Sequence, residues 1–301
     1  MTDLQNKIIS LKKEKGALVL AHYYQGREVR EIADHVCDSF DMAMRAREAR
    51  EQILVICGVR FMAESAKILN PDKTVLLPSP GVGCPMADMI APDDVAELRA
   101  KHPGAAVVCY VNSSAAVKAV SDVCCTSSSA VKIVSALPSD RIIFIPDRNL
   151  GAYVASKVPS KEIILYDGCC PIHDRAGETD VLAARRTHPG ARLLAHPECR
   201  DEVLRHADYI GSTSGIIKYA LDSAESEFII ATEVEIADGL SKLAPGKSFF
   251  PLAAGFECAD MKKTTPADVL NSLEHGEFVV TVDDEDNAAA RKSLEQMVAL
   301  G

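Results

Sequence analysis

The sequence lacks the features that mark membrane, secreted and nucleic-acid-binding proteins. No apolar run approaches the roughly 18 residues that a membrane-spanning helix needs. The first residues, MTDLQNKIISLKKEKG, have the spacing of an amphipathic helix and no signal-peptide core. No cluster of lysine and arginine is present, and the formal net charge of −10 argues against a nucleic-acid surface. We therefore expect a cytoplasmic protein that binds neither membranes nor nucleic acid.

The sequence also has no CxxC pair and no linker rich in glycine, serine or proline, although it holds ten cysteines in 301 residues. In a leaderless chain of this length, thiols indicate metal binding or catalysis rather than a disulfide framework. Structural zinc sites usually draw their ligands from closely spaced pairs of cysteines. The absence of such pairs makes zinc the weaker of the metal interpretations.

One short motif occurs three times. His188 to Cys199 reads HPGARLLAHPEC, His102 to Asn112 reads HPGAAVVCYVN, and Gly16 to Tyr24 reads GALVLAHYY. In each copy a Gly-Ala step leads into an apolar run, which is too short for a helix and is typical of a buried parallel strand. A second apolar strand follows in each copy, at 53–57, 142–145 and 228–231. Self-similarity at a fixed period predicts three units of the same structure.

Polar residues follow the first strand of each copy, at His22–Tyr24, Tyr110–Asn112 and His196–Glu198. Open α/β sheets bind ligands at the carboxyl ends of their strands, so equivalent strands would bring these side chains to one place. Each copy then has a hydroxyl-bearing step that is suited to cap a helix, at 38–39, 126–128 and 212–214.

Each copy closes on a cysteine in a glycine-containing loop, and these residues are Cys84, Cys170 and Cys258. They are 86 and 88 residues apart, which is the period of the repeat. Three such thiolates can hold three irons of a cubane cluster and leave the fourth iron open as a Lewis acid. Spacing alone leaves Cys169 as an alternative to Cys170. The remaining cysteines lie in or next to apolar segments and are expected to be structural: Cys37, Cys57, Cys109, Cys124, Cys125 and Cys199.

The repeat predicts an α/β fold. Three pseudo-symmetric βαβ-type domains, each with three layers (α/β/α), would surround a pseudo-threefold axis with the active site at the centre. The expected units are residues 1–88, 89–174 and 175–270, with the tail 271–301 packing near the first unit. Within the first unit, the spacing from Arg27 to Val36 predicts a helix.

A series of motifs runs along nearly the whole chain: AHYYQ at 21–25, CDSF at 37–40, FMAESAKILNP at 61–71, GCPMAD at 83–88, YVNSSA at 110–115, CTSS at 125–128, HPEC at 196–199, GSTSG at 211–215 and CADMKKTT at 258–265. In this order they resemble the motifs of the quinolinate synthase family. The resemblance implies the second enzyme of bacterial and archaeal NAD biosynthesis from aspartate. One departure is Cys37, where the family usually has glycine before the Asp-Ser pair.

The resemblance implies a 4Fe-4S cluster with one open iron, held by Cys84, Cys170 and Cys258. The run from Cys170 to His173 fits the family pattern and selects Cys170 over Cys169. The implied reaction condenses iminoaspartate with dihydroxyacetone phosphate and loses phosphate and water to give quinolinate. The implied partners are these two small molecules and, in transient contact, the enzyme that produces iminoaspartate.

Such substrates carry carboxylates and a phosphate into an acidic protein. Helix N-termini at Ser39, Ser127, Ser212 and Thr213 would neutralise these negative charges locally. The expected substrate-binding residues are His22, Asp38, Ser39, Tyr110, Val111, Asn112, Ser127, His173, His196, Pro197, Glu198, Ser212 and Thr213. Among them Asn112 would orient the substrate, and Asp38 would hold a neighbouring histidine or lysine.

The reaction also needs several proton transfers. We expect Glu198 to be the principal general base, because it is the only carboxylate on the three matched strand ends. Tyr24 and His196 are assigned to isomerisation and proton transfer. The expected catalytic residues are Glu198, Tyr24, His196, Tyr110 and His22.

Three other interpretations stay open. A hydro-lyase of another hydroxy acid would share the open-iron cluster but not the condensation. An iron-sulfur sensor without catalysis would have no use for the polar strand ends. An enzyme with Cys84 as nucleophile would need a histidine partner, and the sequence fixes none.

Overall fold

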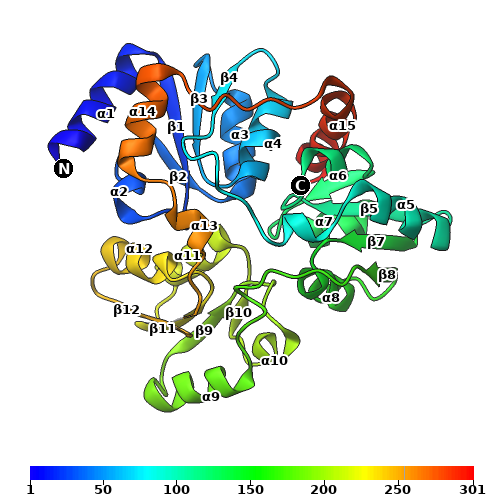
Figure 1. The fold of residues 1–301 in the computed structure, drawn as a ribbon. Coiled ribbons are helices and arrows are strands. Elements are labelled where there is room, and N and C mark those ends of the chain that lie inside the picture. Colours follow the sequence, from blue (N-terminus) through cyan, green and yellow to red (C-terminus); the bar gives the residue numbers. More distant parts are fainter. Residues whose placement is uncertain (254) are drawn as a thin grey trace.

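The computed structural model describes residues 1–253 and 255–301. Within them, three four-stranded parallel sheets follow one another along the chain. Their strand orders are β2-β1-β3-β4, β6-β5-β7-β8 and β10-β9-β11-β12, which is the same order three times. Figure 1 shows the three sheets arranged around the middle of the molecule. The predicted α/β fold of three repeated units is confirmed.

The first repeat shows how the sequence builds the three layers. Alternate residues of the strands face opposite sides: Leu20 and Ile56 pack with Met42 of α3 in one buried cluster. Val19 and Val55 pack with residues of α1 and α14 in another. The elements of this repeat are α1 (Asp3–Glu14), β1 (Ala17–His22), α2 (Arg27–Arg30), β2 (His35–Cys37), α3 (Ser39–Glu48), β3 (Ile53–Cys57), α4 (Arg60–Leu69) and β4 (Thr74–Leu76).

The helix expected from Arg27 to Val36 is wrong in its second half. The helix α2 ends at Arg30, and His35–Cys37 forms β2 instead. Val36 pairs with Ala21 of β1, so the backbone hydrogen bonds of this segment go to a neighbouring strand. Local spacing contains no information about that long-range pairing.

The second and third repeats follow the same plan. In the third, Leu193 and Ile229 pack towards α9 and α10, whereas Leu194 and Ile230 pack towards α11 and α12. The second contains η1 (Ala87–Met89), α5 (Pro92–Lys101), β5 (Ala106–Tyr110), α6 (Ala115–Ala119), β6 (Val123–Cys125), α7 (Ala130–Ala136), β7 (Arg141–Ile145), α8 (Arg148–Lys157) and β8 (Glu162–Leu165). The third contains α9 (Glu178–Thr187), β9 (Arg192–Ala195), α10 (Asp201–Leu204), β10 (Tyr209–Ile210), α11 (Thr213–Asp222), β11 (Glu227–Ala231), α12 (Glu235–Leu243) and β12 (Ser248–Pro251).

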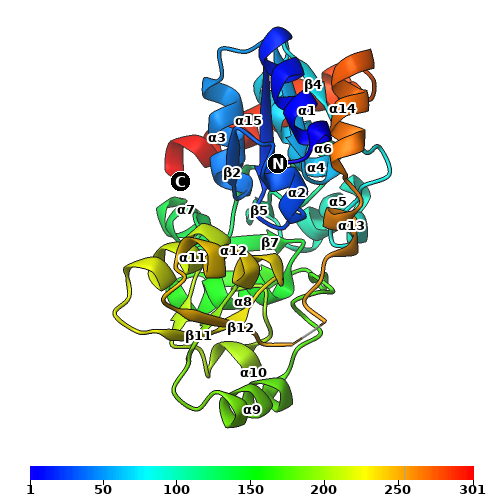
Figure 2. The same ribbon diagram turned by 90° about the vertical axis from the view of Figure 1, so that its left-hand side faces the viewer.

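Three helices follow the third sheet: α13 (Ala259–Lys262), α14 (Pro266–His275) and α15 (Asp284–Leu300). The helix α14 packs beside α1 on the first sheet, and α15 packs on α6 and β6 of the second repeat and on α4 of the first (Figure 2). Buried Ser293 of α15 donates a hydrogen bond to the Lys118 carbonyl, 3.0 Å away. The chain therefore returns to the first two repeats after completing the third. The exact domain boundaries stay a prediction.

None of the helices in the described part of the chain is long and apolar enough to span a membrane.

Candidate active site

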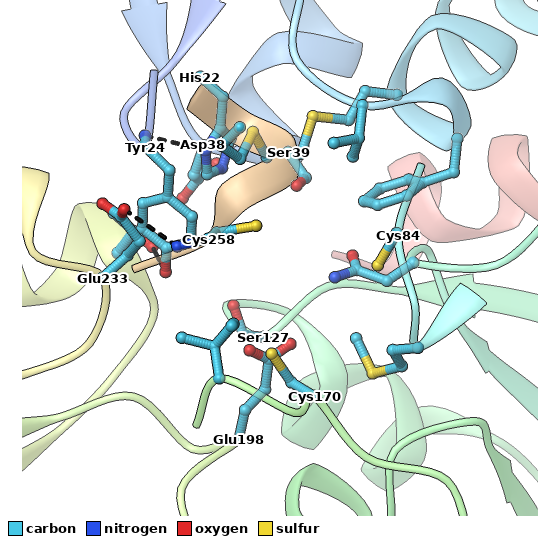
Figure 3. A pocket seen from close by; sticks show the side chains of 18 of the residues that line it. His22, Tyr24, Asp38, Ser39, Cys84, Ser127, Cys170, Glu198, Glu233 and Cys258 are labelled. Carbon is cyan, nitrogen blue, oxygen red and sulfur yellow. Dashed lines mark hydrogen bonds between the residues drawn. The ribbon is translucent and has the colours of Figure 1, made fainter. Parts of the chain in front are cut away.

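A pocket lies where the carboxyl ends of β1, β5 and β9 meet (Figure 3). It encloses about 730 Å³ of space, counting its opening to solvent. The expected site residues that line it are His22, Tyr24, Asp38, Ser39, Cys84, Tyr110, Asn112, Ser127, Cys170, His173, His196, Glu198, Thr213 and Cys258. The residues expected to bind substrate that do not line it are Val111, Pro197 and Ser212.

One cysteine of each repeat reaches the pocket. Cys84, Cys170 and Cys258 are partly exposed, and Figure 3 shows their side chains approaching the pocket from different sides. Cys169 does not line the pocket, so of the two adjacent thiols only Cys170 is placed to act there. The six cysteines that were expected to be structural are buried. The three pocket thiols are free, as metal binding requires.

Carboxylates hold the backbone of all three cysteine loops. The Cys170 amide donates to Asp147 Oδ2 at 3.1 Å, and the Cys258 amide donates to Glu233 Oε1 at 3.4 Å. Asp147 and Glu233 each lie two residues beyond the third strand of their repeat and are fully buried. In the first repeat the amide of Gly83, beside the cysteine, donates to Asp260 at 3.2 Å. These hydrogen bonds to the backbone fix the positions of the three cysteine loops.

Glu198 lies between two histidines. Its Oε2 atom is 2.7 Å from His173 Nδ1 and 3.4 Å from His196 Nδ1. Burial alone would raise the pKa of Glu198, but His196 and His173 outweigh it and hold the pKa well below its usual range. The other oxygen, Oε1, is buried and has no hydrogen-bond partner among the described residues. Glu198 is therefore ionised and has one free acceptor.

The Cys170 thiol joins this group, since its Sγ atom lies 3.2 Å from His173 Nδ1. The donor atoms of Cys170, His173 and Glu198 all lie within 4.8 Å of one another. These three residues could hold a metal ion, besides the set formed by the three cysteines.

His22 and His196 remain neutral at pH 7 because they are buried. Burial lowers the pKa of His22 to about 4, against the opposing effect of Asp38. Burial likewise lowers the pKa of His196, against the effect of Glu198.

The Asp38 carboxylate accepts hydrogen bonds from the amides of Phe40 and Asp41 at the start of α3. It also accepts one from the Ser214 hydroxyl at 2.5 Å. Neither a histidine nor a lysine is among its hydrogen-bond partners in the described residues, and the expected role of Asp38 towards a neighbouring histidine or lysine stays a prediction.

The helix ends agree in part with the expectation. Ser39 and Thr213 are the first residues of α3 and α11, and Ser212 caps α11. The expectation for Ser127 is wrong, because α7 begins only at Ala130. The Ser127 hydroxyl instead lies 3.1 Å from His196 Nε2. The turn that follows β6 and contains Ser127 continues for several residues before α7 starts.

The sequence matches the family model described as Quinolinate synthetase A protein over residues 6–299. The chain belongs to the quinolinate synthase family of enzymes. It is 50% identical to the quinolinate synthase of Caldicellulosiruptor bescii over 298 residues, which covers 99% of this chain and 98% of that one. It is 50% identical to the quinolinate synthase of Methanoregula boonei over 297 residues, with the same coverage. Identity to the Alkaliphilus metalliredigens quinolinate synthase is 48% over 299 residues, 99% of each chain.

Several residues at this quinolinate synthase family site were not expected from the sequence. Lys262 donates to the Tyr24 carbonyl at 2.7 Å and lies 2.7 Å from Glu233 Oε1. Buried Thr232 contacts the Tyr24 hydroxyl at 2.8 Å. Met62, Met86 and Met261 also line the pocket. Aligning the second and third copies would have found Asp147 and Glu233, which lie at equivalent positions after β7 and β11, whereas the first copy has Val59 there.

Proposed function

We propose that this protein makes quinolinate by condensing iminoaspartate with dihydroxyacetone phosphate, with release of phosphate and water. The observation that carries the proposal is the convergence of Cys84, Cys170 and Cys258 on one pocket that also holds Glu198. The family membership and the names of the relatives support it. The enzyme that produces iminoaspartate would be a transient partner, in the cytoplasm.

In this proposal Cys84, Cys170 and Cys258 hold a 4Fe-4S cluster. The residues fit such a group, because three free thiols reach one pocket from three repeats and the nearby Glu198 Oε1 atom has no partner. When bound, the cluster would supply an open iron that acts as a Lewis acid on a substrate hydroxyl that leaves as water. The remaining chemistry belongs to the side chains of the chain itself.

Substrate anions would bind at the helix ends. The N-termini of α3 and α11, with Ser39 and Thr213, border the pocket, and one helix end contributes about 0.3 to 2 kcal/mol to anion binding. The Asn112 Oδ1 atom is buried without a partner among the described residues. Its amide is free to orient a substrate that both donates and accepts hydrogen bonds.

Glu198 would act as the general base through its free Oε1 atom. Its contacts with His173 and His196 hold the pKa of Glu198 low. Loosening either contact would raise that pKa, and Glu198 would then take up a proton more readily. Burial and the charge of Glu198 raise the pKa of both Tyr24 and Tyr110 well above its usual range. Both phenols therefore stay protonated and would donate hydrogen bonds or protons to substrate oxygens. His22 and His196, being neutral, would serve as the second set of proton carriers.

The test is anaerobic purification with iron and sulfide counting, followed by a quinolinate assay with the two substrates. We compare the wild type with Cys84→Ser, Cys170→Ser and Cys258→Ser, and use Cys169→Ser as the matched control beside the pocket. About four irons per chain and quinolinate synthesis in the wild type and the control, with loss of both in the other three variants, would support the proposal. A full cluster without quinolinate would point to a hydro-lyase or a sensor. Zinc in place of iron would overturn the cluster.

A further inference from the structure

The motif FMAESAKILNP forms most of α4 and places one carboxylate, Glu64, behind the wall of the pocket. Phe61 and Met62 of this helix line the pocket, whereas Glu64 is buried and does not line it. The Glu64 Oε2 atom accepts a hydrogen bond from the amide of Ala115 at 3.1 Å, and Oε1 accepts one from Arg60 Nε at 3.1 Å. A buried carboxylate is costly unless it is hydrogen-bonded or paired, and here each oxygen has a partner.

The contact with Ala115 crosses from one repeat to the next. Glu64 belongs to α4 of the first repeat, and Ala115 is the first residue of α6 in the second. The two helices pack against each other. This hydrogen bond therefore ties the start of α6 to a neighbouring repeat.

The turn between β5 and α6 begins at Tyr110 and contains Asn112, and both residues line the pocket. Within this turn the Ser113 hydroxyl donates to the Tyr110 carbonyl at 3.0 Å. Lys118, which is fully buried, donates to the Ser113 carbonyl. The second repeat thus holds the turn through Ser113 and Lys118, and the first repeat holds it through Glu64.

The side chain of Asn112 depends on the position of this turn. Its Oδ1 atom is buried and has no hydrogen-bond partner among the described residues. No contact of that oxygen with the protein therefore corrects its direction if the backbone moves. The backbone of the turn decides where Asn112 meets a substrate.

We propose that Glu64 is a positioning residue that holds this turn where Asn112 can orient a substrate. The inference rests on the proposed function, because Asn112 has this task in that reaction. Without the carboxylate, the Ala115 amide loses its acceptor, and the turn is held only from within its own repeat. Asn112 then shifts away from the substrate, and the loss of one hydrogen bond weakens binding about tenfold.

The experiment compares wild type, Glu64→Met and Glu64→Gln in steady-state quinolinate synthesis, with rates expressed per cluster-loaded chain. Methionine keeps the length of the side chain and removes the acceptor, whereas glutamine keeps an oxygen that can accept from Ala115. Asp94→Leu is the matched control. Asp94 Oδ2 also accepts a backbone amide, that of Ala91 at 2.7 Å, at the start of α5 in the second repeat and outside the pocket.

We expect the KM of at least one substrate to rise about tenfold in Glu64→Met, with kcat little changed. Glu64→Gln should recover most of the KM, and Asp94→Leu should keep the wild-type value. A loss of folded protein would lower the rate and leave KM unchanged, so the KM separates positioning from stability. Glu64→Asp keeps the charge and shortens the side chain. It should raise the same KM, and it carries the test if Glu64→Met does not fold.

A double-mutant cycle shows whether Glu64 acts through Asn112. In the Asn112→Ala background, Glu64→Met should raise the KM no further, because the group that it positions is already gone. Additive effects of the two substitutions would overturn the proposal. An unchanged KM in both Glu64→Met and Glu64→Asp would overturn it as well.

Crystal structures of Glu64→Met and Glu64→Gln give a readout that needs no activity. The turn at 110–115 should be displaced with methionine and stay in place with glutamine, and an unmoved turn in Glu64→Met would overturn the proposal. A wild type that makes no quinolinate defeats the proposed function, and the position of the turn then decides on Glu64 alone.

Discussion

His22 and His196 occupy equivalent places in two different repeats and accept the same hydrogen bond. The amide of Tyr24 donates to His22 Nδ1 at 3.2 Å, and the amide of Glu198 donates to His196 Nδ1 at 3.4 Å. Each imidazole is thereby held by the backbone two residues further on. A neutral ring with Nδ1 as acceptor carries its hydrogen on Nε2. The turn after β1 thus selects this tautomer of His22, whereas at His196 the Glu198 carboxylate competes for Nδ1, with its Oε2 atom also 3.4 Å away.

The first prediction is that the stability of the protein falls as the pH drops below about 6.5, the pKa of an unfolded histidine. The folded-state pKa of His22 is about 4, so between these values the unfolded chain binds a proton that the folded chain does not. The free energy of unfolding then falls by at most about 1.4 kcal/mol per pH unit for this group. His196, whose pKa burial also lowers, adds to the slope.

Anaerobic urea unfolding at pH 7.5, 6.5 and 5.5 measures that slope. His22→Asn should flatten it, and His275→Asn, which alters an exposed histidine, should leave it unchanged. A wild-type stability that is constant over this range would contradict the prediction.

A second prediction concerns the carboxylate that holds the Cys170 loop. In Asp147→Asn, the Oδ1 atom can still accept from the Leu150 amide at the start of α8, where the distance is now 2.8 Å. The new amide group would face the Cys170 amide, so two donors would meet where Oδ2 now accepts. We expect the iron content to fall while the helix cap survives. Iron per chain and the thermal unfolding midpoint are the two measurements, and a full complement of iron would show that this contact does not place Cys170.

Glu198→Gln is the third prediction. Removing a general base typically costs about 100- to 10,000-fold in rate, so kcat should fall within that range while the three cysteines keep their iron. Glu225→Gln, on the exposed surface beside Arg192, is the control and should have wild-type activity. Full turnover in Glu198→Gln with an intact cluster would exclude the role of base.

The fourth prediction tests the ion pair between Lys262 and Glu233. Lys262→Met leaves the Glu233 carboxylate, 1% exposed, buried without its cation. It also removes the contact with the Tyr24 carbonyl. Leaving such a group unsatisfied costs about 1 to 3 kcal/mol. The double variant with Glu233→Gln should recover part of this loss, because the unpaired charge is gone. Urea unfolding of the four proteins gives the coupling, and additive effects would refute it.

The sequence predicted the long strands well because their apolar runs carry the signal themselves. The central strand β5 lies at 106–110, within the apolar run of the motif from His102 to Asn112. The short edge strands β2, β6 and β10 have three, three and two residues, too few for a period to be seen. Their pairing with β1, β5 and β9 is a long-range contact that local patterns do not contain.

The site was predicted where it follows the repeat and missed where it depends on side chains crossing between repeats. Strand-end residues such as Tyr24 and Glu198 were found because equivalent strands end at one place. Thr232 and Lys262 act across repeat boundaries. Their contacts with Tyr24 join residues more than 200 positions apart in the chain, so spacing could not indicate them.

The common strand order of the three sheets has a consequence for how such a site can diversify. An assembly of three identical chains around one axis would be obliged to place the same pair of side chains at every strand end. Here the three units are parts of one polypeptide, and their ends read His22–Tyr24, Tyr110–Asn112 and His196–Glu198. Joining the units releases each from the symmetry of the others, so an asymmetric substrate can meet a different chemical surface on each side.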